Sequence, residues 1–169
     1  MILMIFSTGA FLLLFIFGFY WVYAIIKGAP YYPSSTAAVR AIIDVISTQK
    51  NAKIVELGAG DGKIAIALAK KGFAVSAIEL NPILTVITRL KAKLAGADLK
   101  VINADFLRCD LSEYNIAVAY LYPGIMQKLE PKLFKEMPKG SMIISNTFSI
   151  KSREPYKKIE PKILIYKVG

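Results

Sequence analysis

A glycine-rich stretch that joins a strand-like run to a helix-like run restricts the fold of this chain more than any other feature. Residues 53–57 are mostly apolar and β-type, glycine recurs at positions 58, 60 and 62, and apolar side chains then follow at helical spacing over 62–71. Glycine tolerates the positive φ of a tight turn, and a helix N-terminus offers unpaired N–H groups. The stretch predicts a ligand site where the strand ends, as in open α/β sheets.

Strand-like and helix-like segments alternate along the rest of the chain. Strands are expected at 53–57, 74–78, 100–102, 116–121 and 142–145, helices from Ser34 or Ser35 onward and at 62–71, 82–95 and 126–137, and paired strands at 156–159 and 162–168. This alternation is typical of an α/β fold: a Rossmann-like, mostly parallel sheet, here with an antiparallel C-terminal strand. A length of 169 residues leaves room for one such domain.

The N-terminus has a different composition. Residues 1–26 carry no charged side chain, and Tyr20, Trp21 and Tyr23 stand near the end of this stretch. About 20 apolar residues cross a hydrocarbon core, and aromatic rings prefer its boundary with water. A cleaved signal peptide would need a positive n-region and a small-residue cleavage site, and neither is evident. We therefore expect one N-terminal transmembrane helix.

The expected domain organisation follows from this stretch and from the prolines after it. Residues 1–27 are expected as the transmembrane anchor, 28–36 as a linker and gating segment, and 37–169 as the ligand-binding domain. Basic residues follow the apolar stretch and none precedes it. The positive-inside rule then predicts a single-pass membrane protein with its domain on the cytoplasmic side.

Charge and residue usage exclude several functions. The net charge of +10 fits attraction to anionic lipid headgroups better than nucleic-acid binding, because the lysines are scattered without a recognised nucleic-acid module. Cys109 is the only cysteine and there is no histidine. An intrachain disulfide, a His/Cys metal site and a catalytic triad are therefore excluded.

The spacing of the glycines discriminates between ligands. A dinucleotide fingerprint that starts at Gly58 would need glycine at position 63, which is Lys63 here. Glu56, two places before the first glycine, would repel a pyrophosphate. A carboxylate suits a cationic ligand, and S-adenosylmethionine carries both an amino group and a sulfonium. We therefore expect S-adenosylmethionine as the cofactor and no metal.

Acidic residues also follow the next two expected strands. Glu79 stands 21 residues after Gly58, where such sheets place a carboxylate on ribose hydroxyls, and Asp105-Phe106 would contact adenine. Each motif also has a purely structural explanation, as a tight turn or a helix cap. The expected cofactor-binding residues are Glu56, Gly58, Ala59, Gly60, Gly62, Glu79, Leu80, Asn81, Asp105, Phe106 and Tyr120.

Several segments together resemble a known family. They are Ala29-Pro30-Tyr31-Tyr32-Pro33-Ser34-Ser35, Glu56 to Lys63, Glu79-Leu80-Asn81-Pro82, Tyr120-Leu121-Tyr122-Pro123 with Met126, Leu129-Glu130-Pro131-Lys132-Leu133 and Ser145-Asn146-Thr147-Phe148. With them the chain resembles the class I S-adenosylmethionine-dependent methyltransferases from Ala29 to its end. More narrowly it resembles the protein-lysine methyltransferases that include the ATP synthase c-subunit lysine methyltransferase and archaeal relatives.

This resemblance implies methyl transfer to the lysine ε-amino group of a protein, which in membrane-anchored members lies close to the membrane. The family usually has aspartate where this chain has Glu56, arginine where it has Lys63, and more aliphatic residues where it has Tyr120 to Tyr122. The implied partner is a membrane-associated protein with an accessible lysine.

The acceptor lysine must lose its proton, since its unperturbed pKa is about 10.4. We expect Tyr31, Tyr120 and Tyr122 to line a partly apolar acceptor channel in which desolvation lowers that pKa, and no residue stands out as a general base. Three other functions stay open: a small-molecule or lipid methyltransferase, an RNA methyltransferase, and a catalytically silent membrane-anchored binding protein.

Overall fold

The computed structural model describes residues 32–49 and 51–169, together with residues 9, 11, 15 and 18. The chain divides into two compact units, Met1–Tyr31 and Tyr32–Gly169. The sheet and the candidate site belong to the second unit.

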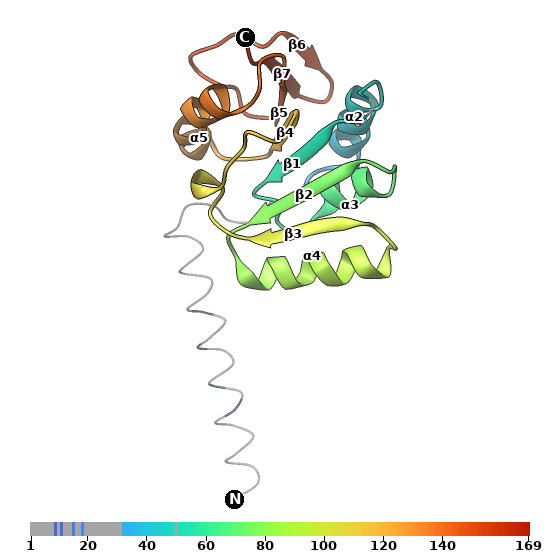
Figure 1. Ribbon diagram of the computed structural model, residues 1–169. Helices are drawn as coiled ribbons and strands as arrows, with labels where there is room; N and C mark the ends of the chain where they lie inside the picture. Colours follow the sequence, from blue (N-terminus) through green and yellow to red (C-terminus); the bar gives the residue numbers. More distant parts are fainter. Residues whose placement is uncertain (1–8, 10, 12–14, 16–17, 19–31, 50) are drawn as a thin grey trace, which may run out of the picture. The chain divides into compact units, whose positions relative to one another are not determined.

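A seven-stranded sheet in the order β3-β2-β1-β4-β5-β7-β6 forms the centre of this unit (Figure 1). Strands β1 to β5 run parallel, whereas β7 runs antiparallel to both β5 and β6. The expected Rossmann-like sheet with an antiparallel C-terminal strand is confirmed. The strands are β1 Lys53–Leu57, β2 Ala74–Glu79, β3 Leu99–Asn103, β4 Ile116–Ala119, β5 Met142–Asn146, β6 Lys157–Ile159 and β7 Ile163–Lys167.

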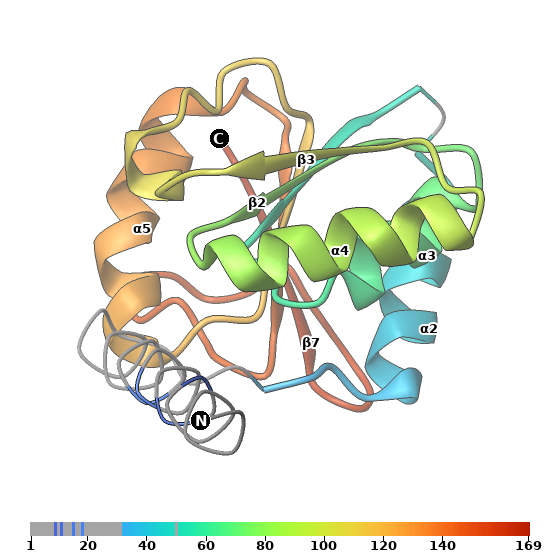
Figure 2. The ribbon, with the colours of Figure 1, turned by 90° about the horizontal axis from the view of Figure 1, so that it is seen from below.

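Helices cover both faces of the sheet: α2 Thr36–Ile46, α3 Lys63–Ala69, α4 Pro82–Leu94 and α5 Pro123–Glu136, with a short 3₁₀ helix η1 at Phe106–Arg108. In Figure 2, α5 lies on one side of the strands and α2 and α3 on the other. Side chains of β1 alternate between the two faces. Ile54 therefore packs with α2 and α3, whereas Val55 and Leu57 pack with α5.

Capping residues determine where two helices begin. Ser35 accepts a hydrogen bond from the Ala38 N–H at 3.1 Å and so caps α2, one of the two serines expected for this role. Asn81 caps α4, and Pro82 occupies the first helical position, where its fixed φ fits.

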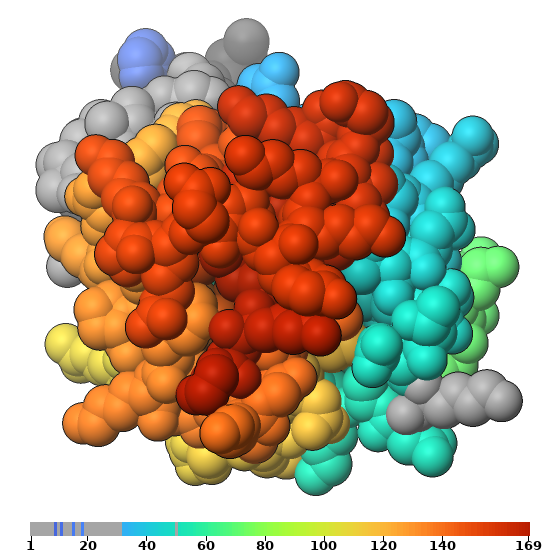
Figure 3. Space-filling model, turned by 90° about the horizontal axis from the view of Figure 1, so that it is seen from above, coloured from blue at the N-terminus to red at the C-terminus, as the bar shows by residue number. Residues whose placement is uncertain are grey.

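The C-terminal hairpin closes the sheet beyond β5. Seen from above, C-terminal residues drawn in red occupy the middle of this face, between residues in orange on one side and in blue to teal on the other (Figure 3). Thr147, just after β5, donates its N–H to the Lys162 carbonyl at 2.8 Å. Strand β7 therefore begins beside the carboxyl end of β5.

The expected transmembrane helix requires a correction. Within residues 32–49, 51–169 and the four isolated described positions, no helix is long and apolar enough to cross a membrane. The longest described helix, α5, has 14 residues and carries charged side chains, whereas a span needs about 20 apolar ones. Most of residues 1–27 lie outside the described residues. The expected boundaries of a linker over 28–36 and a domain over 37–169 stay predictions.

Candidate functional site

The turn between β1 and α3 depends on its glycines. Gly58, Gly60 and Gly62 have φ angles of +72°, +59° and +77°, a region that favours glycine. A Cβ at Gly58 would lie 2.8 Å from Leu121 Cδ2, and one at Gly62 would lie 2.4 Å from Thr88 Cγ2. The Gly58 N–H donates to the Ile78 carbonyl at 2.9 Å, which fixes the turn to β2. Conformation and space therefore both require glycine at positions 58 and 62.

Glu79 ends β2 and holds this turn from the neighbouring strand. Its Oε2 accepts the Gly60 N–H at 2.8 Å, and its Oε1 accepts the Asn81 N–H at 2.7 Å. Burial raises the pKa of Glu79, and the N–H groups of Asn81 and Gly60 oppose that rise. The Leu80 N–H also interacts with this carboxylate, and a carboxylate has about four acceptor positions, so at least one is left. The carboxylate can therefore still accept ligand hydroxyls while it holds the turn.

Glu56, next to last in β1, caps α3 from the sheet. The residue that precedes α3 is Gly62, which has no side chain, and Glu56 Oε2 accepts the Ala65 N–H at 2.8 Å in its place. Burial raises the pKa of Glu56 to about 8, and the Ala65 N–H opposes this. A cation placed beside the carboxyl would favour its charged form. Glu56 thus suits a cationic ligand.

Two of the expected ligand contacts also have structural roles. Asn81 Oδ1 accepts the Ile83 N–H at 2.9 Å as the cap of α4, and Asp105 Oδ1 accepts the Leu107 N–H at 2.9 Å as the cap of η1. Leu80, between β2 and α4, is exposed. The Phe106 ring is buried and points toward the glycine turn, since a Cβ at Gly58 would lie 3.9 Å from its Cε1.

Aromatic rings gather after β4 and β5. Tyr120 follows β4, and its ring centroid lies 6.1 Å from that of Phe148 and 6.2 Å from that of Tyr32. The Tyr122 ring lies 5.8 Å from Phe148. We call Tyr32, Tyr120, Tyr122 and Phe148 the aromatic cluster.

The structure thus brings together two of the three expected acceptor-channel tyrosines, Tyr120 and Tyr122, whereas Tyr31 lies outside the described residues. Reasoning from the sequence did not assign Tyr32 or Phe148 to the site. Both residues stand in segments that carry the family resemblance, and this position is the sequence feature that could have assigned them to the site.

Ser34 connects the segment before α2 to two other elements. Lys63 Nζ, at the start of α3, donates to the Ser34 carbonyl at 2.7 Å, and Asn146 Nδ2, at the end of β5, donates to Ser34 Oγ at 3.3 Å. Ser34 and Asn146 are both buried. These bonds hold Tyr32 near the ends of the strands, and neither was expected from the sequence.

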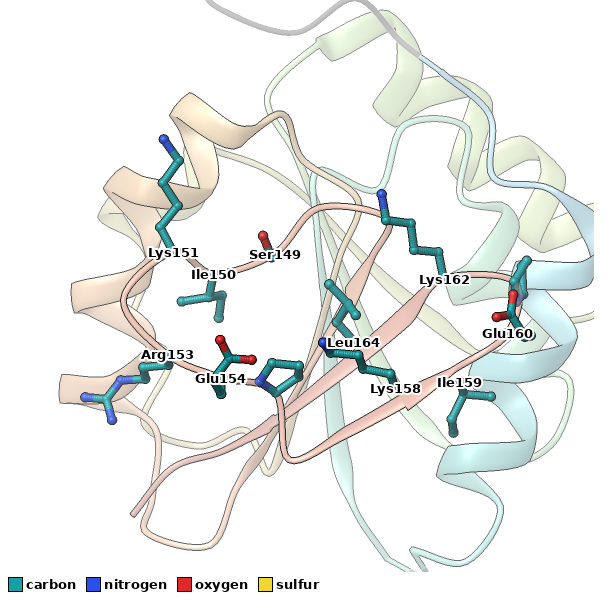
Figure 4. Close-up of a pocket in the computed structure, with 12 residues that line it drawn as sticks. Ser149, Ile150, Lys151, Arg153, Glu154, Lys158, Ile159, Glu160, Lys162 and Leu164 are labelled. Atoms are coloured by element: carbon teal, nitrogen blue, oxygen red, sulfur yellow. The ribbon is translucent and has the colours of Figure 1, made fainter.

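A separate cavity of about 590 Å³ lies over the C-terminal hairpin (Figure 4). Lys151, Lys158 and Lys162 line it together with Glu154 and Glu160. None of the expected cofactor-binding residues borders this cavity, so it is distinct from the candidate site. In the described part of the chain, no group of three or more His, Cys, Asp or Glu side chains could hold a metal ion.

Comparison with known proteins identifies the family. The family model of the ANTKMT methyltransferase domain matches residues 56–157, more than half of the chain. The chain belongs to this methyltransferase family. The match runs from Glu56 to the start of β6 and includes both buried carboxyls, so the methyltransferase resemblance seen in the sequence is confirmed.

Individual proteins similar to this chain are also methyltransferases by name. The human ATP synthase c-subunit lysine N-methyltransferase is 31% identical over 121 residues, which cover 70% of this chain and 52% of the relative. A protein-lysine N-methyltransferase from Saccharolobus islandicus is 26% identical over 140 residues, 78% of this chain and 84% of the relative. The chain therefore spans about half the length of the human relative and most of the archaeal one.

Among solved structures, an RNA methyltransferase from Salinibacter ruber in complex with S-adenosyl-L-homocysteine superposes with a TM-score of 0.78. It is 26% identical, and the superposition covers 81% of this chain and 94% of that one. Both the sequence and the fold therefore place the chain among methyltransferases.

Proposed function

We propose that this chain is an S-adenosylmethionine-dependent protein-lysine N-methyltransferase. The observation that carries the proposal is the pair of buried carboxyls, Glu56 and Glu79, at the ends of adjacent strands on either side of the glycine turn. The family match and the names of the human and archaeal relatives support methylation of protein lysine.

The residues present fit the cofactor. Glu56 is a buried carboxyl with no ion pair among the described residues, which suits a ligand that brings positive charge. Glu79 offers acceptors for hydroxyl groups, and the Phe106 ring beside Gly58 offers an apolar surface for a base. When bound, S-adenosylmethionine supplies a methyl group on a positively charged sulfur, which a neutral amine takes in one displacement. The S-adenosyl-L-homocysteine complex of the Salinibacter relative supports this choice.

The aromatic cluster orients the acceptor. Tyr120 follows β4, the neighbour of β1, so the cluster begins next to the glycine turn. Packing a lysine side chain among rings removes water from its amino group, which favours the neutral, nucleophilic form. Aromatic faces also bind the methylated ammonium that results. Alignment and exclusion of water are the main contributions of the protein to such a transfer.

The proposed partner is a protein with an accessible lysine. The name of the human relative gives the ATP synthase c-subunit as its substrate, which supports a protein acceptor here. The cytoplasmic location of the domain stays a prediction.

The test is transfer of a radiolabelled methyl group to components of native cell fractions, comparing the wild type with Glu79→Gln. We expect label in a protein band that yields methyl-lysine on hydrolysis, and much less label with Glu79→Gln at limiting cofactor. Label that extracts with lipid would support lipid methylation and contradict the proposal.

RNA methylation is the second candidate, because the Salinibacter relative is an RNA methyltransferase of which the superposition covers 94%. The net charge of +10 would also attract RNA, although the scattered lysines form no recognised nucleic-acid module. This candidate requires label that ribonuclease removes and RNA binding that weakens steeply with salt. Neither is expected for a protein-lysine methyltransferase.

A further inference from the structure

Four of the six large apolar side chains of helix α4 face outward, while Leu84 and Ile87 are half-buried. The residues that it buries are small, namely Thr85, Thr88 and Ala92, each at most 4% exposed. Facing outward are Ile83, Val86, Leu90 and Leu94, which are between 45% and 88% exposed. A surface helix normally buries its large apolar side chains and presents polar ones to water. In α4 the fully buried side chains are small, and four large apolar side chains are exposed.

Hydrogen bonds to backbone carbonyls and, for Thr88, close packing against the glycine turn explain the two inner threonines. Thr88 Oγ1 donates to the Gly60 carbonyl at 2.9 Å, and its methyl group lies 2.4 Å from the position that a Cβ of Gly62 would take. Thr85 Oγ1 donates to the Asn81 carbonyl at 3.0 Å. The inner face of α4 therefore stabilises the fold, whereas the large apolar side chains on the outer face make no contribution to the packing of the described domain that would explain them.

The outer residues form one continuous stripe. Their spacing of three, four and four residues puts Ile83, Val86, Leu90 and Leu94 on one side of the helix. At 1.5 Å per residue the stripe is about 16 Å long. Leu80, 40% exposed, precedes the stripe in the loop between β2 and α4. Single exposed apolar residues are ordinary, but a contiguous patch marks an interaction surface.

The charges of α4 indicate what this surface binds. The helix carries Arg89, Lys91 and Lys93 and no acidic residue. At about 100° per residue, Lys91 and Lys93 border the stripe on opposite sides. Lys91 is paired with Asp61 at 2.5 Å, yet its side chain stays half exposed. A second copy packed on the same stripe would bring like charges together. A negatively charged surface fits the basic borders instead.

We propose that the outer face of α4 docks on an anionic lipid bilayer. The four apolar side chains enter the boundary between headgroups and acyl chains, and the basic residues stay among the headgroups. Apolar faces bordered by Lys and Arg are typical of helices that lie in a membrane interface. This docking requires no membrane-spanning segment and does not depend on the proposed methyl transfer.

The experiment uses the full chain with Cys109→Ser, so that one new cysteine carries a polarity-sensitive fluorophore. One variant adds Leu90→Cys in the stripe, and the matched control adds Lys135→Cys on the exposed side of α5. Both are mixed with vesicles of phosphatidylcholine, with or without phosphatidylglycerol. Thermal unfolding first verifies that both labelled variants are folded.

We expect the label at position 90 to shift to the blue with anionic vesicles and the label at position 135 not to shift. Adding Lys93→Gln should lower the vesicle affinity reported by the label at 90 about fivefold. No shift at 90, or equal shifts at both positions, would overturn the proposal. A blue-shifted label at 90 without vesicles would also overturn it, because a second copy or residues 1–26 would then cover the stripe.

Discussion

The Glu79 carboxylate accepts a hydrogen bond from the Gly60 N–H at 2.8 Å, across 19 residues of sequence. The side chain that ends β2 thus holds the turn that follows β1. Glu56 does the same for α3 through the Ala65 N–H. Glu79 thus holds the glycine turn and Glu56 holds the helix that follows it, so a change at either acid should affect both stability and cofactor binding.

Gly62→Ala should destabilise the domain by about 2–4 kcal/mol. The substitution combines a left-handed backbone conformation with overpacking against the Thr88 methyl group, 2.4 Å from the new Cβ. Gly72→Ala is the matched control, because Gly72 has a similar φ of +85° and nothing within 4 Å of the Cβ position. It should cost only about 1 kcal/mol. Urea denaturation measures both.

The clash at Gly62 should be relieved by a second change. Thr88→Ser removes the methyl group and keeps the hydroxyl that donates to the Gly60 carbonyl. The double variant Gly62→Ala/Thr88→Ser should therefore recover about 1–2 kcal/mol relative to Gly62→Ala. Equal stability of the single and double variants would show that the Thr88 methyl group does not restrict this position.

Glu56 should make the cofactor-free protein less stable as pH rises. Its pKa is about 8 in the folded protein against an ordinary value of 4.5, so between these pH values the folded state binds more protons than the unfolded state. Stability then falls with rising pH by at most about 1.4 kcal/mol per unit and levels off above pH 8.

Glu56→Gln should flatten this dependence, because Gln keeps an acceptor for the Ala65 N–H and does not titrate. Urea denaturation at pH 5, 6, 7 and 8 compares the two proteins. The pKa of Glu79 is also raised, so some slope should remain. If the variant kept the whole slope of the wild type, Glu56 would not be its source.

Phe148→Ala should impair methyl transfer more than cofactor binding. Phe148 contacts both Tyr120 and Tyr122, so its loss opens the aromatic cluster to water. We expect kcat/KM for the acceptor to fall at least about tenfold, which corresponds to roughly 1.4 kcal/mol. The affinity for S-adenosyl-L-homocysteine should stay within about threefold, which is roughly 0.6 kcal/mol. Tyr156→Ala, an exposed ring in the C-terminal region, is the control and should change neither.

Local patterns in the sequence were enough to predict most of the sheet and the start of α4 at Pro82, since strand composition and caps are read over a few residues. The sequence pattern predicts β4 to end at residue 121, whereas it ends two residues earlier, at Ala119. Its pairing with β1 stops at Ala119, after which Leu121 packs on Gly58. The start of α5 was placed too late as well, because no side chain caps it before Pro123.

The acids of the candidate site were predicted, but their partners were not. Gly60 and Glu79 come into contact only after β1 and β2 pair. Tyr32 and Tyr120 are ring neighbours although they lie far apart in the sequence. The same limit applies to α4. The alternation of strands and helices and Pro82 at the first helical position predict the helix, but neither tells which face meets the sheet, and here the threonines do.

The most direct test of the cofactor site is calorimetric titration of S-adenosyl-L-homocysteine into the wild type and into Glu79→Gln. Glu113→Gln, at an exposed carboxylate paired with Lys53, is the control. We expect one site per wild-type chain, unchanged affinity in Glu113→Gln, and affinity at least about tenfold weaker in Glu79→Gln, because a charged acceptor is lost. No binding to the folded wild type, or equal binding to all three proteins, would contradict a cofactor site at the ends of β1 and β2.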